Sequence, residues 1–108
     1  MLPTGPADAS RELCAVVRER FGQRVERTRL FGSYARGDWG PDSDVDVLVV
    51  VRGLTEPERR EIFDLAWDIY AQRLIHVNPL ALSDAEWADL VSRERRIVAD
   101  IEREGIAL

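Results

Sequence analysis

The sequence predicts a small α/β (α+β) protein in which a mixed β-sheet is flanked by helices. Residues 45–52 contain the nearly continuous β-branched run VDVLVVV, which is typical of a central strand buried on both faces. TEPE at 55–58 and SDAE at 83–86 have the pattern of a capping box, and each opens a stretch with apolar residues at helical spacing. Strands and helices therefore alternate, as they do in a sheet covered by helices.

The first half of the chain contains one predicted helix and two predicted strands. Residues 1–6, with two prolines and a glycine, are expected to form a loose leader. Apolar residues at helical spacing indicate a helix over 8–21, which Asp8 or Ser10 could cap and which Gly22 ends. The predicted strands span 25–31 and 45–52, and a short helix that begins at Tyr34 or Ala35 is expected between them.

The second half is predicted to add a helix, a third strand and further helical structure. The capping box at 55–58 opens a helix that continues to about residue 73. The segment LIHVNPLAL, residues 74–82, reads as a strand, and Pro79 places it at an edge or at a bulge because proline cannot donate to a ladder. Helical character then runs from the second capping box, with or without a bend, to Gly105, which suits a helix end.

Length and charge narrow the class of protein. The 108 residues are enough for one domain, 1–108, and not for two. The net charge of −5 argues against a broad basic surface for DNA, so no direct DNA binding is expected. The longest apolar run is far shorter than the roughly 20 residues of a membrane span, and the N-terminus does not resemble a signal peptide. A cytoplasmic protein without a membrane segment is the expectation.

The chemistry of the sequence is concentrated at Asp44 and Asp46. Because side chains alternate along a strand, both carboxylates are predicted to point to the same face. Neighbouring carboxylates repel each other unless a cation lies between them, and oxygen ligands suit Mg²⁺, which typically combines one or two carboxylates with substrate phosphates. Residues 42–44, which follow Pro41, could instead form an ordinary turn, but turn chemistry does not explain a carboxylate inside VDVLVVV.

A second group of residues, Gly32 and Ser33, follows the predicted strand 25–31. Glycine allows the backbone to approach a phosphate closely, and a short helix that starts here would offer free N–H groups to an anion. The two residues could also form an ordinary strand-to-helix corner. Arg36 could reach a phosphate, or it could form a surface ion pair with Asp38 or Asp42.

Together these residues resemble a known signature. Gly32-Ser33, Arg36-Gly37 and Ser43-Asp44-Val45-Asp46 followed by apolar residues are similar to the nucleotidyltransferase domain related to DNA polymerase beta, and in particular to its small stand-alone members, the minimal nucleotidyltransferases (MNT). The resemblance covers nearly the whole chain. It implies a short mixed sheet flanked by helices and transfer of a nucleoside monophosphate from a nucleoside triphosphate, ATP above all, to a hydroxyl with Mg²⁺. It also implies that Gly32 and Ser33 hold the triphosphate and that Asp44 and Asp46 bind the metal, and Arg36 is a further candidate for binding the nucleotide.

The sequence departs from the family at a third carboxylate, which active members carry on the next strand and which binds metal and acts as base. The segment 74–82 contains no acid, and Asn78 is the best candidate for this third catalytic position. An amide oxygen can bind Mg²⁺ but cannot accept a proton. His76, predicted on the same face of the strand, is a candidate base, although a lone histidine is more often a packed or surface residue.

The resemblance leaves two main hypotheses of function. Small bacterial members commonly pair with a HEPN-domain protein as the antitoxin of a toxin–antitoxin system, and some transfer AMP to a tyrosine of that partner. The alternative, favoured by the missing acid, is a catalytically weak or inactive binding module that neutralises a HEPN partner by complex formation. A third reading, an antibiotic-modifying nucleotidyltransferase, usually requires an additional helical domain. The acceptor, the base preference and a homo-oligomeric state stay open.

Overall fold

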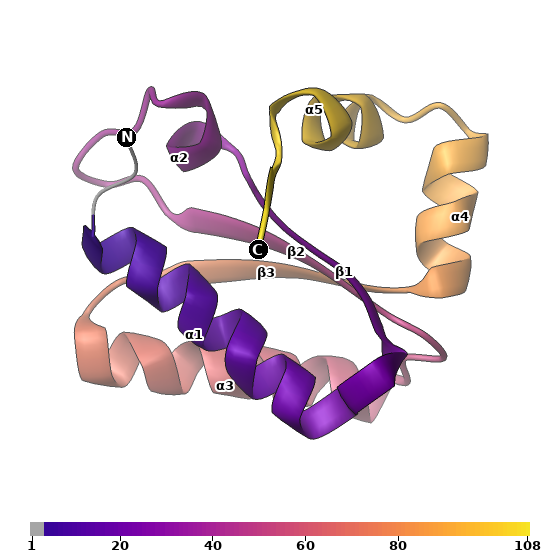
Figure 1. The fold of residues 1–108 in the computed structure, drawn as a ribbon, viewed down its shortest axis with the longest axis horizontal. Coiled ribbons are helices and arrows are strands. Elements are labelled where there is room, and N and C mark those ends of the chain that lie inside the picture. Colours follow the sequence, from indigo (N-terminus) through magenta and orange to yellow (C-terminus); the bar gives the residue numbers. More distant parts are fainter. Residues whose placement is uncertain (1–3) are drawn as a thin grey trace.

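One mixed sheet with the strand order β3-β2-β1-β4 organises the protein in the computed structural model, which describes residues 4–108 (Figure 1). Strand β2 runs antiparallel to β1 and parallel to β3, and the short β4 is antiparallel to β1. The prediction of a small mixed sheet flanked by helices is confirmed. The strands are β1 (Val25–Phe31), β2 (Val45–Val51), β3 (Val77–Ser83) and β4 (Ile106–Ala107).

Helices cover both faces of this sheet. Helices α1 and α3 lie along one face, while α4 and α5 lie on the other (Figure 1). Within residues 4–108, no helix combines the length and the apolar character needed to cross a membrane. The helices are α1 (Thr4–Phe21), α2 (Ser33–Arg36), α3 (Glu56–Arg73), α4 (Asp84–Ser92) and α5 (Arg96–Glu104), and a 3₁₀ turn, η1 (Gly22–Arg24), follows α1.

Strand β2 is the centre of the protein, and its side chains divide between two cores. Val47 and Val49 belong to the larger core under α1 and α3, whereas Leu48 and Val50 pack with Ile101 of α5. Every residue of β2 is buried except Asp46, which is half-buried. Because alternate residues share a face, Asp46 lies on the side of the sheet that α4 and α5 cover.

The N-terminal expectations need two corrections. Residues 4–6, expected in a loose leader, form the first turn of α1, because a proline at position 6 is tolerated where helical N–H groups have no partner; residues 1–3 lie outside the described residues. Neither Asp8 nor Ser10 caps the helix, because α1 begins at Thr4 and both lie inside it. Ser10 is buried, and its hydroxyl donates to the carbonyl of Ala7 at 2.8 Å.

Other boundaries follow the predictions with local differences. Both capping boxes form, at Thr55 and at Ser83, and β3 is an edge strand, as Pro79 indicated. The strand expected from residue 74 begins only at Val77, since Leu74 adopts a left-handed conformation (φ 57°) that ends α3. The bend allowed in the last helix is a complete break between α4 and α5.

Strand β4 was missed by the sequence analysis. Ile106 and Ala107 pair with Leu30 and Arg29 of β1. Two residues are too few to show the alternation that identifies a strand, so only the tertiary structure reveals this edge.

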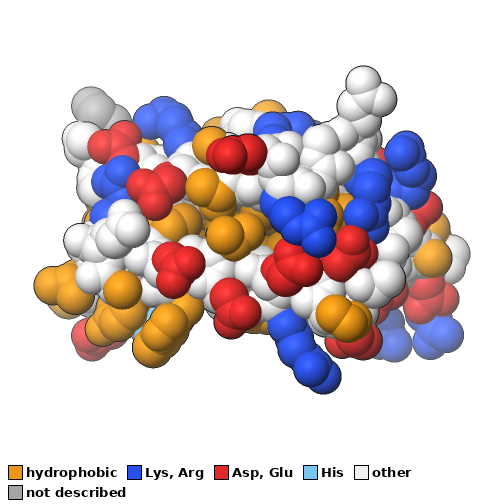
Figure 2. Space-filling model, turned by 90° about the horizontal axis from the view of Figure 1, so that it is seen from below, with side chains coloured by type: hydrophobic (Ala, Val, Ile, Leu, Met, Phe, Trp, Pro, Cys, Tyr) orange, Lys and Arg blue, Asp and Glu red, His pale blue; other side chains and the backbone are white. Residues whose placement is uncertain are grey.

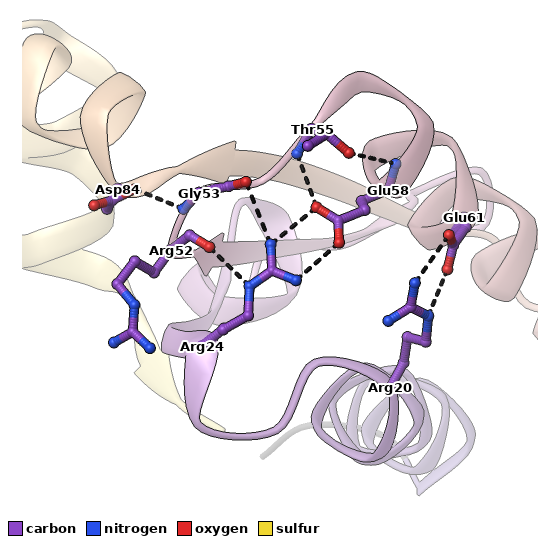
Figure 3. Close-up of polar contacts among 8 residues, drawn as sticks. All are labelled: Arg20, Arg24, Arg52, Gly53, Thr55, Glu58, Glu61 and Asp84. Carbon is purple, nitrogen blue, oxygen red and sulfur yellow. Dashed lines mark hydrogen bonds and ion pairs between the residues drawn. The ribbon is translucent and has the colours of Figure 1, made fainter.

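A cluster of polar contacts closes the end of the sheet where α3 begins (Figure 3). The Arg24 guanidinium donates to both carboxylate oxygens of Glu58, at 2.8 and 2.9 Å, and also to the carbonyls of Arg52 and Gly53. Glu58 also accepts from the backbone N–H of Thr55 in the capping box. One bidentate ion pair therefore connects the start of β1, the end of β2 and the first turn of α3.

This ion pair predicts an acid-sensitive contribution to stability. The hydrogen bonds from Arg24 are the main cause that lowers the pKa of Glu58 from 4.5 to about 2. The pKa is lower in the folded than in the unfolded state, so the pair stabilises the fold above the unfolded value and is lost as pH falls through the folded one. We expect Arg24→Met to lower the melting temperature at about pH 7, and much less at about pH 2.

Circular dichroism melts across this pH range measure the effect. Arg20→Met, which removes the more exposed ion pair with Glu61 at 2.7 Å, is the matched control and should change the melting temperature less. An equal loss for Arg24→Met at both ends of the range would show that lost packing, not the ion pair, is responsible.

Candidate active site

Three neighbouring strands meet at Asp46, and β3 contributes a second polar side chain beside it. In the sheet register, Asp46 of β2 lies between Phe31 of β1 and Asn78 of β3. The side-chain amide of Asn78 donates to Asp46 Oδ1 at 3.1 Å. Asn78, the candidate for the third catalytic position, therefore contacts Asp46 from the neighbouring strand.

Gly32 lies directly against the same carboxylate. A Cβ at this position would overlap Asp46 Oδ2 and lie 3.1 Å from its Cγ. The backbone of Gly32 also has φ 77° and ψ −156°, a region that essentially only glycine adopts. The absence of a side chain thus allows the corner between β1 and α2 to approach the acid, as the sequence analysis expected for neighbouring strands.

Asp44 and Asp46 interact, as their spacing predicted. Burial is the main cause that raises the pKa of Asp46 above its ordinary value, and the negative charge of Asp44 raises it further. The hydrogen bond from Asn78 and the charge of Arg36 act in the opposite direction. Asp44 is exposed just before β2. Asp44 therefore lies close enough to Asp46 for the two charges to repel each other, and the Asp46 carboxylate lies against the Gly32 corner.

This donor set fits a hard divalent cation. Two carboxylates and one amide offer oxygen ligands, and a cation between the acids would relieve their repulsion. Within residues 4–108 no group of three or more His, Cys, Asp or Glu side chains could hold a metal ion. Oxygen donors of this kind suit a cation that combines one or two carboxylates with substrate phosphates.

Ser33 and Arg36 are both on the four-residue helix α2. The helix begins at Ser33 itself, not at Tyr34 or Ala35, with Gly32 as its N-cap. Ser33 therefore does not cap the helix through its side chain. Arg36 is exposed and donates to Asp38 at 3.1 Å and to Glu104 at 3.5 Å. The ion pair with Asp38 is confirmed and the alternative with Asp42 is not formed, while Arg36 still acts electrostatically on Asp46.

A cavity of about 360 Å³ lies beside Gly32, between α2 and α5. Sequence reasoning missed the wall that α5 provides. A signal was available, because Arg96, Asp100 and Glu104 recur every four residues and so share one face of a helix. The cavity is lined by Phe31, Gly32, Arg36, Arg96, Ile97, Asp100 and Glu104.

His76 lies on the opposite flank of the site, just before β3. Its ring is 4.4 Å from that of Tyr70 and 6.1 Å from that of Trp67 between centroids. His76 and Asn78 line a common cavity together with Asp44, so the strand brings them to the same region, as the alternation predicted. His76 thus packs against aromatic rings while remaining near the acids.

Comparison with known proteins places this geometry in a family. The model of the family described as "Nucleotidyltransferase domain" matches residues 10–108. The chain belongs to the nucleotidyltransferase domain family. The resemblance inferred from Gly32-Ser33 and from the acidic pair is thereby confirmed.

Individual relatives agree with this assignment. A Methanocaldococcus jannaschii protein named "Putative protein adenylyltransferase" is 37% identical over 67 residues, which cover 56% of this chain and 68% of that protein. A solved structure described as a "putative minimal nucleotidyltransferase" is 25% identical and covers 94% of this chain and 91% of its own, with a TM-score of 0.61.

A third comparison shows the fold alone. A structure described as a tri-AMPylated Shewanella oneidensis HEPN toxin in complex with MNT antitoxin contains a chain with a TM-score of 0.52 to this one. The two chains are 15% identical, and the match covers 94% of this chain and 70% of the other. The fold described above is therefore the fold of minimal nucleotidyltransferases, including one found in a toxin–antitoxin complex.

Proposed function

We propose that this protein is a Mg²⁺-dependent nucleotidyltransferase that transfers AMP from ATP to a hydroxyl of a HEPN-domain partner, as the MNT-type antitoxin of a toxin–antitoxin pair. The observation that supports this most is the placement of the half-buried Asp46 against the side-chain-free corner at Gly32 and beside Asp44. A carboxylate in this position is costly without a cation, and the missing side chain at Gly32 lets the backbone corner lie directly against it.

Each residue of the site has a proposed role in this reaction. Asp44 and Asp46 hold the divalent cation, which supplies Lewis-acid stabilisation of charge on the triphosphate. Gly32 and Ser33 support the triphosphate through the backbone and the hydroxyl, and Arg36 exchanges its surface ion pair for a phosphate oxygen. These contacts orient the α-phosphate for attack from the acceptor side.

The proposed transfer forms one bond and breaks one bond. The oxygen of the acceptor hydroxyl bonds to the α-phosphorus, the bond from this phosphorus to the bridging oxygen breaks, and pyrophosphate leaves. The hydroxyl proton leaves to His76 or to solvent, since Asn78 cannot accept it. The orienting hydrogen bond from Asn78 to Asp46 keeps the carboxylate in place.

The choice of acceptor is supported by the comparisons. One relative is named as a protein adenylyltransferase, and one structural neighbour is described with an AMPylated HEPN toxin.

One observation favours the second candidate function. The position that lies beside Asp46 on β3 is an amide and not an acid. A protein that lost this acid could neutralise a HEPN partner by covering it, with nucleotide binding but without transfer. The two candidates share the fold and the partner, and they differ only in chemistry.

Labelled ATP tests the proposed function. With Mg²⁺ and the purified HEPN-domain partner, label from α-³²P-ATP is expected on the partner, whereas label from γ-³²P-ATP is not. Asn78→Asp restores the third acid and is expected to increase the transfer rate by about tenfold or more, because a positioned general base typically contributes at least that factor.

The outcomes separate the candidates. A tight complex without label, which Asn78→Asp converts into a transferring one, identifies a binding module that lost its base. A complex in which neither the wild-type protein nor Asn78→Asp transfers label contradicts the proposed enzyme. Label from γ-³²P-ATP would indicate phosphoryl transfer instead.

A further inference from the structure

Helix α3 leaves an apolar stripe uncovered on the protein surface. Phe63, Trp67 and Leu74 are 45%, 61% and 77% exposed, and with Tyr70 they follow one another at helical spacing along one side of the helix. Figure 2 shows hydrophobic side chains gathered at the left end of the face that α1 and α3 present. Core packing does not explain the stripe, because α3 buries Ile62, Ala66 and Ile69 instead.

A groove separates this stripe from the edge strand β3. It has a volume of about 260 Å³, and its walls are Phe63 and Trp67 on one side and Val77 and Pro79 on the other. The volume is below the roughly 300–1,000 Å³ of typical small-molecule sites, so it suits one or two side chains of a protein. Pro79 offers no backbone N–H, which disfavours addition of a partner strand and favours side-chain recognition.

The groove leads to Asp44, one of the two proposed metal-binding acids. Asp44, His76 and Asn78 line the same cavity as Phe63 and Trp67. The rings of Trp67, Tyr70 and His76 contact one another, with centroids 5.4 Å apart for Trp67 and Tyr70, so this wall is formed before anything binds. An apolar side chain seated here would bring its neighbouring residue to Asp44.

The charges around the groove define the complementary segment. Residues 61–72 of α3 include Glu61, Asp64 and Asp68 but no lysine or arginine. Asp64 and Asp68 flank Trp67 in sequence, and neither forms an ion pair with another residue in the 4–108 region. Because Asp64 and Asp68 are four residues apart, they share one side of α3 next to the apolar stripe, and a basic segment would meet uncompensated negative charge along that side.

We propose that this groove docks the acceptor segment of the partner: a stretch with one large apolar side chain, at least one arginine or lysine, and the acceptor hydroxyl beside them. The apolar side chain occupies the space between Phe63, Trp67 and Pro79, and the hydroxyl lies at Asp44. The inference rests on the proposed function for the identity of the hydroxyl as acceptor, whereas docking itself depends only on the groove.

Peptide binding tests the docking directly. The probe is acetyl-Arg-Leu-Tyr-Arg-amide, added to ¹⁵N-labelled protein and followed by NMR. Shifts are expected at the Trp67 indole and at the amides of Asp44 and Asn78. Trp67→Ser should weaken binding at least about fivefold, since exposed tryptophans in such grooves dominate interface energetics. The same peptide with aspartate in place of leucine should not bind.

Val91→Ser is the matched control, because Val91 is 46% exposed on α4, outside the groove lining. It should leave peptide affinity unchanged. Peptide shifts confined to other surfaces, or an unchanged affinity in Trp67→Ser, would overturn the docking proposal. Folding of each variant is checked by the dispersion of its NMR spectrum.

Transfer kinetics separate this inference from the proposed function. With the HEPN-domain partner, Trp67→Ser should raise KM for the partner by about fivefold or more while kcat and Mg²⁺-ATP affinity stay near wild type. Peptide binding in the groove without label transfer by any chain would support the docking and contradict the enzyme. Transfer with an unchanged KM in Trp67→Ser would support the enzyme and overturn the docking.

Discussion

Asp46→Asn is expected to abolish nucleotidyl transfer while making the metal-free protein more stable. The substitution keeps the shape of the side chain and an oxygen that can accept from Asn78. It removes the half-buried charge that Asp44 repels. Loss of the reaction and gain of stability therefore have the same cause, which is a carboxylate placed for a cation and not for the fold.

The size of the catalytic loss follows from the role of the metal. Metal ions contribute several kcal/mol of transition-state stabilisation, and each 1.4 kcal/mol or so is tenfold in rate, so a loss of about a thousandfold is expected. Transfer of label from α-³²P-ATP measures it. Mg²⁺ with ATP should raise the melting temperature of the wild-type protein and not that of Asp46→Asn.

The pH dependence has a definite sign. Burial and Asp44 place the pKa of Asp46 above its unfolded value of 3.8. The free energy of unfolding of the metal-free wild-type protein is therefore highest below pH 3.8, where Asp46 is protonated, and falls as pH rises through the folded pKa. Asp46→Asn cannot ionise, so this fall is expected to be absent in the variant.

Asp42→Asn is the control for the change in charge, because Asp42 is exposed in the loop before β2. It should transfer label at the wild-type rate. An Asp46→Asn variant that keeps transferring, or that melts earlier than wild type without metal, would contradict the assignment.

Gly32→Ala is expected to cause the second large effect, on both stability and activity. The added Cβ overlaps Asp46 Oδ2, and the backbone conformation at position 32 is strained for alanine. The strain alone is of order 1–3 kcal/mol. Relief of the overlap requires the carboxylate to move, which breaks its hydrogen bond with Asn78. Urea denaturation measures the stability, and label transfer should fall to background.

Gly37→Ala provides the comparison. Gly37 also has a positive φ, of 87°, but nothing lies within 4 Å of its added Cβ. Its backbone lies in the left-handed region, where alanine costs about 1–2 kcal/mol. Gly37→Ala should therefore be mildly destabilised and retain transfer. If Gly32→Ala and Gly37→Ala lowered stability and label transfer equally, close approach to Asp46 would not explain why position 32 requires glycine.

A double substitution isolates the overlap. In the background of Asp46→Ala, the carboxylate that collides with position 32 is absent, so Gly32→Ala should be less destabilising than in wild type. A coupling of about 0.5 kcal/mol or more is expected for residues in contact. Additive changes in the free energy of unfolding would show that Gly32→Ala destabilises the protein through backbone strain alone.

Local chemistry explains what the sequence analysis predicted correctly. The run VDVLVVV specified β2, since β-branched residues without polar breaks fit a strand buried on both faces. The capping boxes at Thr55 and Ser83 specified two helix starts because each satisfies its own backbone N–H groups within four residues. Gly32 and the acidic pair stay candidate site residues, which were selected because their chemistry is unusual for their positions.

The misjudged regions depended on partners far away in sequence. β4 exists only because β1 offers a free edge, and a two-residue strand has no pattern of its own. Residues 4–6 of α1 were expected in a leader because the segment 1–6 contains two prolines and a glycine, although the buried residues that follow hold the helix against the sheet.

The central strand, the helix starts and the candidate residue types of the site can be read from the order of the amino acids, since these depend on neighbours within a few positions. The contact between Asn78 and Asp46, the pairing of Arg36 with Glu104 and the wall that α5 forms beside Gly32 became visible only in the folded chain. Strand register and the packing of distant helices are set by the burial of the whole core, and no local pattern records them.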